Sequence, residues 1–220
     1  MSQVTLSMES ESVQYLCKKD KYLSKVIERI GVIQYNPINE NPYAFLIHEI
    51  IEQMLSIKAA QKIYERLEVL CEGVITPDRI SQLSDEEIRN AGTSNAKVEY
   101  IRNITSAVLN GTVDFEVMNT LTDDEAIKTL TQIRGIGNWT AKMYLMFVLD
   151  RQNILPIEDG AFIQVYRWMY DTDDCSPKSI YAKCKKWSPY STIAARFCYR
   201  ALDAGMTKSD FTSHGKESYL

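Results

Sequence analysis

Apolar residues recur three or four positions apart along most of the chain, the spacing that gathers them on one face of an α-helix. No segment sustains the alternation of apolar and polar residues that is typical of a half-buried strand. The pattern therefore predicts an all-α protein that is nearly all helix. It predicts a short amphipathic helix over residues 22–32, stopping near Gly31, and a long helical stretch over residues 41–70.

Two capping signals divide the chain further. Ser84 is followed three residues later by Glu87, and Thr122 in the same way by Glu125. In such a capping box, hydroxyl and carboxylate each accept a backbone N–H that the first helical turn leaves without a partner. We therefore predict helices that start directly after Ser84 and Thr122, and a further helix over about 95–109.

Composition points to an ordinary globular protein. Of 220 residues, 45% are hydrophobic and 25% are charged. The longest apolar run, residues 143–149, is much too short to span a bilayer, and the first twelve residues do not resemble a secretory signal. We therefore expect a soluble, cytoplasmic protein with no membrane partner. The five cysteines form no CxxC pair, which argues against a disulfide framework, a zinc site and an iron–sulfur cluster.

Charge is unevenly distributed along the chain. The net charge is −4, but residues 178–208 hold seven basic residues against one acidic residue, and residues 112–125 hold five acidic residues and no base. Local positive potential is what a phosphate-binding surface needs. Two solvated helix faces of opposite charge would give the same pattern.

A tight turn between two helical patterns carries the clearest chemistry. In residues 133–149 the turn is built on Gly135 and Gly137, directly before a helix. Glycine permits positive φ and a close approach of the backbone, so such a turn can present free N–H groups to an anion such as a phosphate. An ordinary packing corner between two helices is the alternative for the turn taken alone.

The turn, followed by LPIEDGAF at 155–162, resembles the helix-hairpin-helix DNA glycosylases. Four other segments are similar to the alkylpurine branch, the 3-methyladenine DNA glycosylase II family. They occur in family order and, with the hairpin, cover residues 18 to about 205; they are residues 19–31, 50–60, 91–104 and 187–202.

The resemblance implies two all-helical lobes with an active-site cleft between them. Residues 1–35 would pack with the C-terminal lobe. Residues 36–155 would form the lobe that contains the hairpin, at about 123–149, and residues 156–220 the lobe that carries the catalytic aspartate.

The implied activity is that of a monofunctional DNA glycosylase, which flips an alkylated purine such as 3-methyladenine out of duplex DNA and hydrolyses its N-glycosidic bond in base-excision repair. Asp159 matches the family's catalytic aspartate, with Glu158 as its nearest rival; a lone aspartate here would also suit a helix N-cap. A carboxylate beside C1′ stabilises a cation-like sugar and orients a water. The alternatives are a non-catalytic helix-hairpin-helix module that docks on DNA, and a glycosylase for another damaged base.

The lyase branch of the superfamily carries a Schiff-base lysine two positions after the second hairpin glycine. Trp139 occupies that position here, and an indole cannot form an imine. Lys142 lies three residues later on the same helix face, where it would serve as a phosphate contact or, alternatively, as a displaced nucleophile.

The resemblance also implies which residues contact the DNA. The wedge that fills the space of the flipped base would be Met54, next to Gln53 in the Q-x-x-S pattern that Ser56 completes, although periodicity alone places Met54 in the core. The resemblance also implies pocket walls that stack on a cationic base, at Trp187, Trp139, Tyr144 and Tyr190. It implies phosphate contacts at Gly135, Ile136, Gly137, Asn138 and Lys142, with Arg196 or Arg200 replacing a family arginine.

No cofactor is expected other than a sodium or potassium ion at the hairpin carbonyls, which the resemblance implies. His48 and His214 stand apart from any ligand cluster in the sequence, so we predict no other metal site. The expected partner is duplex DNA containing alkylated purines, bound by a monomer.

Overall fold

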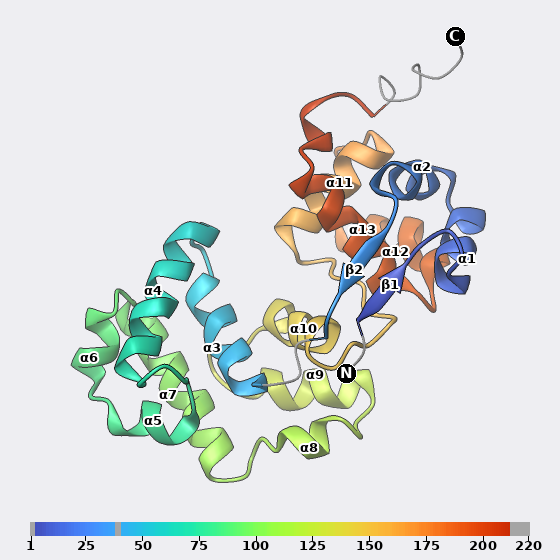
Figure 1. Ribbon diagram of the computed structural model, residues 1–220. Helices are drawn as coiled ribbons and strands as arrows, with labels where there is room; N and C mark the ends of the chain where they lie inside the picture. Colours follow the sequence, from blue (N-terminus) through green and yellow to red (C-terminus); the bar gives the residue numbers. More distant parts are fainter. Residues whose placement is uncertain (1–2, 38–40, 212–220) are drawn as a thin grey trace. The chain divides into compact units, whose positions relative to one another are not determined.

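The computed structural model describes residues 3–37 and 41–211 and divides into two compact units, Met1–Pro37 with Asp150–Leu220, and Ile38–Leu149 (Figure 1). The prediction of an all-α protein is confirmed, because helices make up almost all of the regular structure. None of the helices in residues 3–37 and 41–211 has the length and hydrophobicity of a membrane-spanning segment.

The unit formed by residues 38–149 is entirely helical in its described part. Its elements in chain order are α3 (Pro42–Glu52), α4 (Ile57–Leu70), α5 (Pro77–Gln82), α6 (Asp85–Asn90), α7 (Asn95–Leu109), α8 (Phe115–Met118), α9 (Asp123–Thr131) and α10 (Asn138–Phe147).

Helix α3 lies at the centre of this unit and contacts α4, α7 and α10. Seven of its eleven residues are buried, including Leu46, Ile47, Ile50 and Ile51, so it is apolar on more than one face. Such a helix is stable only when other helices surround it. Each fully buried Leu or Ile side chain contributes about 1.5–3 kcal/mol relative to an exposed one.

The predicted helix starts are confirmed. Ser84 and Thr122 form complete capping boxes with Glu87 and Glu125 ahead of α6 and α9. The hydrogen bonds from each cap lower the pKa of the exposed glutamate. Helix α7 spans the predicted residues.

The long helical stretch predicted for residues 41–70 is divided into two helices. Helix α3 ends at Glu52 and α4 begins at Ile57, where the hydroxyl of Ser56 accepts the N–H of Ala59 at 3.3 Å. Between them Met54 has a φ of +60°, outside the helical region. The apolar periodicity continues across the break, which is why the pattern did not reveal it.

The other unit combines both ends of the chain. Its elements are β1 (Val4–Leu6), α1 (Glu11–Lys19), α2 (Lys21–Ile30), β2 (Ile33–Tyr35), α11 (Gly160–Tyr170), α12 (Pro177–Cys184), α13 (Ser191–Asp203) and the 3₁₀ turns η1 (Lys185–Trp187) and η2 (Met206–Lys208). The strands pair antiparallel with Leu6 opposite Ile33. These short strands are consistent with the prediction of a nearly all-helical chain, since three residues are too few to give a sustained alternating pattern.

Helix α2 packs against α13 and α11 and so joins the N-terminal residues to the C-terminal ones. Gly31, with a φ of +71°, ends α2 close to the predicted position. Phe162, Trp187 and Phe197 are fully buried in this unit.

Candidate active site

Asp159 lies at the start of α11 as its N-cap. Its Oδ1 accepts the backbone N–H of Phe162 at 2.7 Å, and the residue is 8% exposed. Glu158, the rival carboxylate, is exposed. The cap bond fixes the direction of the Asp159 side chain, and a catalytic carboxylate needs such a fixed position. The capping role and the catalytic role are therefore compatible at this residue.

Trp187 does not line a pocket in this structure, contrary to the prediction. It is fully buried, with its ring at 88° to that of Phe162 and the centroids 6.1 Å apart. Its Nε1–H donates to Oδ2 of Asp20 at 2.9 Å, which satisfies the indole N–H without water. An indole enclosed in this way cannot stack on a base; Trp187 instead packs against Phe162, whose backbone N–H donates to Asp159.

Asp20 is a buried carboxylate that the sequence analysis missed. Besides the Trp187 indole, it accepts the hydroxyl of Tyr170 and lies 3.0 Å from Nζ of Lys186. Burial alone would raise the pKa of Asp20, but these donors outweigh it and hold the pKa below its usual value. Asp20 also caps α2, accepting the N–H of Tyr22 at 3.0 Å, and that N-cap position was its one visible signal.

The other predicted pocket aromatics differ in exposure. Tyr144 is fully buried, with ring centroids 6.4 Å from Phe45 and 6.1 Å from Phe115, so its prediction as a pocket wall is also wrong. Trp139, on α10, and Tyr190, ahead of α13, are both half-buried. These two therefore present surface for stacking, whereas Trp187 and Tyr144 fill the cores of their units.

The hairpin consists of α9, a turn and α10. Gly135 has a φ of +107°, and a Cβ there would lie 2.3 Å from Cγ of Tyr100, so only glycine fits. Ile136 is buried and its N–H donates to the carbonyl of Ile133 at 3.0 Å, which corrects its predicted role as a phosphate donor.

The start of α10 remains suited to an anion. Gly137 is the N-cap and, within the described chain, no side chain caps this helix. The first N–H groups of a helix have no intrahelical acceptor, and the helix dipole favours negative charge there. Gly137 and Asn138 are exposed, and Lys142 lies half-buried one turn further on. The uncapped N–H groups that could meet an anion therefore include those at Gly137 and Asn138, but not that of Ile136.

Met54 and Gln53 point in different directions. The Met54 side chain is fully exposed, which is incompatible with the core alternative. Gln53 is half-buried, and its Nε2 donates to the carbonyl of Gly135 at 3.0 Å and lies 3.4 Å from Oγ1 of Thr140. Gln53 therefore connects this turn to the hairpin by a hydrogen bond. Of the two side chains, Met54 is the one that projects outward as a wedge would.

Two of the seven basic residues between 178 and 208 are paired with acidic residues of the protein. Arg196 is 8% exposed, lies 3.1 Å from Oδ1 of Asp150 and stacks 3.7 Å above the ring of Tyr35, so it is not the replacement phosphate contact. Burial lowers the pKa of Arg196 despite these partners. Lys186 pairs with Asp20. Four basic residues of this region are exposed and belong to neither of these ion pairs: Lys178, Lys185, Arg200 and Lys208.

His48 is not isolated from carboxylates, contrary to the prediction. Its Nδ1 lies 3.7 Å from oxygens of both Glu49 and Glu52. The hydrogen bond to Glu49 raises the pKa of His48 against the effect of burial. These three residues offer ligand atoms within 4.8 Å of one another, close enough for one metal ion to contact all three. His214 lies outside the described residues.

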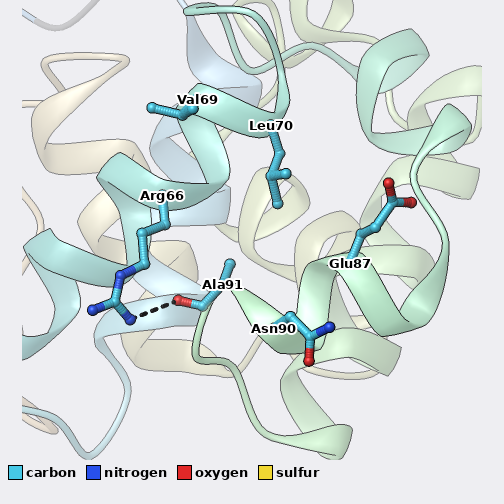
Figure 2. Close-up of a pocket in the computed structure, with 6 residues that line it drawn as sticks. All are labelled: Arg66, Val69, Leu70, Glu87, Asn90 and Ala91. Carbon is cyan, nitrogen blue, oxygen red and sulfur yellow. Dashed lines mark hydrogen bonds between the residues drawn. The ribbon is translucent and has the colours of Figure 1, made fainter.

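A groove of about 420 Å³ between α4 and α6 holds none of the predicted site residues (Figure 2). Val69, Leu70 and Ala91 supply apolar surface, and the guanidinium of Arg66 donates to the carbonyl of Ala91 at 3.4 Å. The groove lies at the C-terminal end of α4, whereas Met54 precedes its N-terminal end. Arg66, the first groove residue of α4, lies nine residues after Ile57, about 14 Å along the helix axis.

The sequence of this chain is similar to those of known DNA repair proteins. Residues 47–189 match the family model described as HhH-GPD superfamily base excision DNA repair protein. The chain is 29% identical over 212 residues to DNA-3-methyladenine glycosylase 1 of Schizosaccharomyces pombe, covering 90% of this chain and 93% of that protein.

Two solved structures are similar over nearly the whole chain. One is the DNA-3-methyladenine glycosidase of Bacillus halodurans, with a TM-score of 0.83, 34% identity and coverage of 95% of this chain and 97% of the other. The second is the Schizosaccharomyces pombe 3-methyladenine DNA glycosylase in complex with abasic DNA, with a TM-score of 0.81, 28% identity and coverage of 88% and 97%.

Proposed function

Because the chain belongs to the HhH-GPD superfamily of base excision DNA repair proteins, we propose that it is a monofunctional DNA glycosylase that releases alkylated purines such as 3-methyladenine. The observation that carries the proposal is the likeness to two 3-methyladenine enzymes over about nine-tenths of the chain, together with a fixed, nearly buried Asp159 where the family's aspartate stands.

In the proposed reaction Asp159 acts on the sugar. As the N-glycosidic bond breaks, positive charge develops at C1′, and the carboxylate stabilises it and orients the attacking water. A purine alkylated at N3 or N7 is already cationic, so it leaves without a general acid to protonate it. A single carboxylate is then sufficient.

Trp139 supports a monofunctional reaction. It stands where lyases of the superfamily hold their Schiff-base lysine, so the backbone is not cleaved through an imine at this position. Lys142 follows one helical turn later and is assigned to phosphate binding. Trp139 in one unit and Tyr190 in the other are each exposed enough to stack on a base, and an electron-rich ring face attracts a cationic one.

Two turns would grip the DNA in this proposal. The amides at the start of α10, from Gly137 and Asn138, bind a backbone phosphate, and Met54 fills the space that the flipped nucleotide leaves. The protein binds duplex DNA as a monomer, which light scattering of the complex would test.

We also propose that the hairpin carbonyls bind a monovalent cation. Oxygens of Arg134 and Gly135 accept side-chain amides from Asn103 and Gln53, and each carbonyl oxygen has a second lone pair. Carbonyl oxygens replace the hydration shell of sodium or potassium readily. DNA affinity in sodium, potassium and tetramethylammonium chloride at equal ionic strength tests this part of the proposal.

The decisive experiment is release of free bases from methylated duplex DNA, identified by chromatography. The wild type should release 3-methyladenine, and Asp159→Asn should lose about two to three orders of magnitude in rate while binding DNA normally. Glu158→Gln is the matched control and should keep near-normal rates. A wild type that binds duplex DNA but releases no base would favour the non-catalytic module.

A further inference from the structure

The turn that presents Met54 has a conformation that the chain does not adopt without support. A residue other than glycine with a φ of +60° costs about 1–2 kcal/mol. Such conformations persist only where the surroundings hold them. The side chain of Met54 is fully exposed and contributes little to its own placement, so other residues must hold the turn.

Lys97 stabilises the Met54 turn through hydrogen bonds. From the first turn of α7, its Nζ donates to the carbonyls of Ile51 and Gln53, both at 2.7 Å. These carbonyls belong to the end of α3, where the helix dipole is negative and where a cation is favoured. Lys97 is half-buried, and burial lowers the pKa of its ammonium group. An ammonium group thus replaces the hydrogen bonds that α3 loses where it stops.

The same face of α7 also supports the hairpin. Tyr100, one turn after Lys97, packs so tightly on Gly135 that no Cβ fits between them. Asn103, a further turn on, donates from Nδ2 to the carbonyl of Arg134 at 3.1 Å. Residues at such spacing lie in one row along a helix. One row on α7, made of Lys97, Tyr100 and Asn103, therefore contacts both the Met54 turn and the hairpin turn.

Gln53 connects the Met54 turn directly to the hairpin turn. Its backbone carbonyl accepts Lys97, while its side-chain amide donates to the carbonyl of Gly135 at 3.0 Å. The position of Met54 relative to the start of α10 is therefore set within one unit of the protein.

We propose that Lys97 is a positioning residue for base flipping, which holds Met54 at a fixed distance from the phosphate-binding hairpin. The inference rests on the proposed role of Met54 as a wedge. Lys97 itself touches neither the base nor the sugar. It acts by keeping the turn in the conformation that enters the DNA, so its loss lets the turn relax and slows insertion.

The test compares Lys97→Met with the wild type in two assays. Lys97→Met keeps the long apolar stem and removes the ammonium group. Single-turnover release of 3-methyladenine should fall about tenfold, the effect of roughly 1.4 kcal/mol in the barrier. The fluorescence change of 2-aminopurine placed beside an abasic-site analogue, which reports wedge insertion without any hydrolysis, should fall in parallel. Lys18→Met, which removes an exposed lysine of α1, is the control and should leave both signals unchanged.

A double-mutant cycle separates positioning from general stability. In a Met54→Ala background there is no wedge to position, so Lys97→Met should cost less than about twofold further. Full additivity of the two effects would overturn the inference, as would a Lys97→Met protein that matches the wild type in both assays. If Lys97→Met does not fold, judged by circular dichroism, Lys97→Gln provides the same comparison.

The two assays distinguish a failure of the proposed glycosylase function from a failure of the inference about Lys97. A wild type that gives the fluorescence change but releases no base refutes the glycosylase reaction, and the inference then stands if Lys97→Met reduces the fluorescence change. A wild type that gives neither signal refutes the wedge and with it the role of Lys97.

Discussion

Replacing Gly135 by alanine should destabilise the protein through the packing of the hairpin on α7. The new Cβ would lie 2.3 Å from Cγ and 2.4 Å from Cβ of Tyr100. Rotation of the Tyr100 side chain can move Cγ but not Cβ, which is fixed to the backbone of α7. The hairpin must therefore shift away from the helix. A β-carbon is also strained at a φ of +107°.

The expected cost combines these two effects. Backbone strain at such a φ is about 1–3 kcal/mol and forced overpacking is about 1–3 kcal/mol. Gly135→Ala should therefore lower the free energy of unfolding by about 2–6 kcal/mol, measured by urea denaturation followed by circular dichroism. A change within about 0.5 kcal/mol of the wild type would refute the argument.

Gly137→Ala is the matched control. Its φ is −94°, and a Cβ at this position meets no atom within 4 Å, so stability should change by less than about 1 kcal/mol. The added methyl group would instead stand beside the uncapped amides of α10, so the affinity for duplex DNA should fall. Equal losses of stability in the two variants would mean that the Tyr100 contact does not select glycine at 135.

Two further predictions concern other parts of the protein. Borohydride added during turnover should trap no covalent protein–DNA adduct, since Trp139 cannot form an imine; a trapped adduct that disappears in Lys142→Ala would contradict this. Asp20→Asn should cost about 2 kcal/mol of unfolding free energy near neutral pH. Because the donors to Asp20 lower its pKa in the folded state, its stabilisation is complete above about pH 4, the unfolded value, and is lost as pH falls through the folded pKa. The wild type and Asp20→Asn should therefore converge in strong acid, and a constant difference would contradict the assignment.

Features that depend on residues close together in the chain could be predicted from the sequence. The helical class, the capping boxes at Ser84 and Thr122 and the glycine turn before α10 all follow from residues within a few positions of one another. Asp159 could be singled out in the same way, because its motif is continuous in the chain.

Which side chains face outward depends on contacts between residues that are far apart in the chain. Trp187 and Tyr144 belong to residue types that suit either a core or a pocket. Trp187 is buried because Asp20, 167 positions away, accepts its N–H, and Arg196 is withdrawn from the surface by Asp150, 46 positions away.

The break between α3 and α4 has the same origin. The apolar spacing of residues 41–70 fits one continuous helix, and no local signal strong enough to stop it precedes Ser56. The helix ends where Lys97, from α7, takes the carbonyls of Ile51 and Gln53. A helix terminus depends on what satisfies its last carbonyls, and here that partner comes from more than forty residues further along the chain, so only the folded chain places Met54 at the surface.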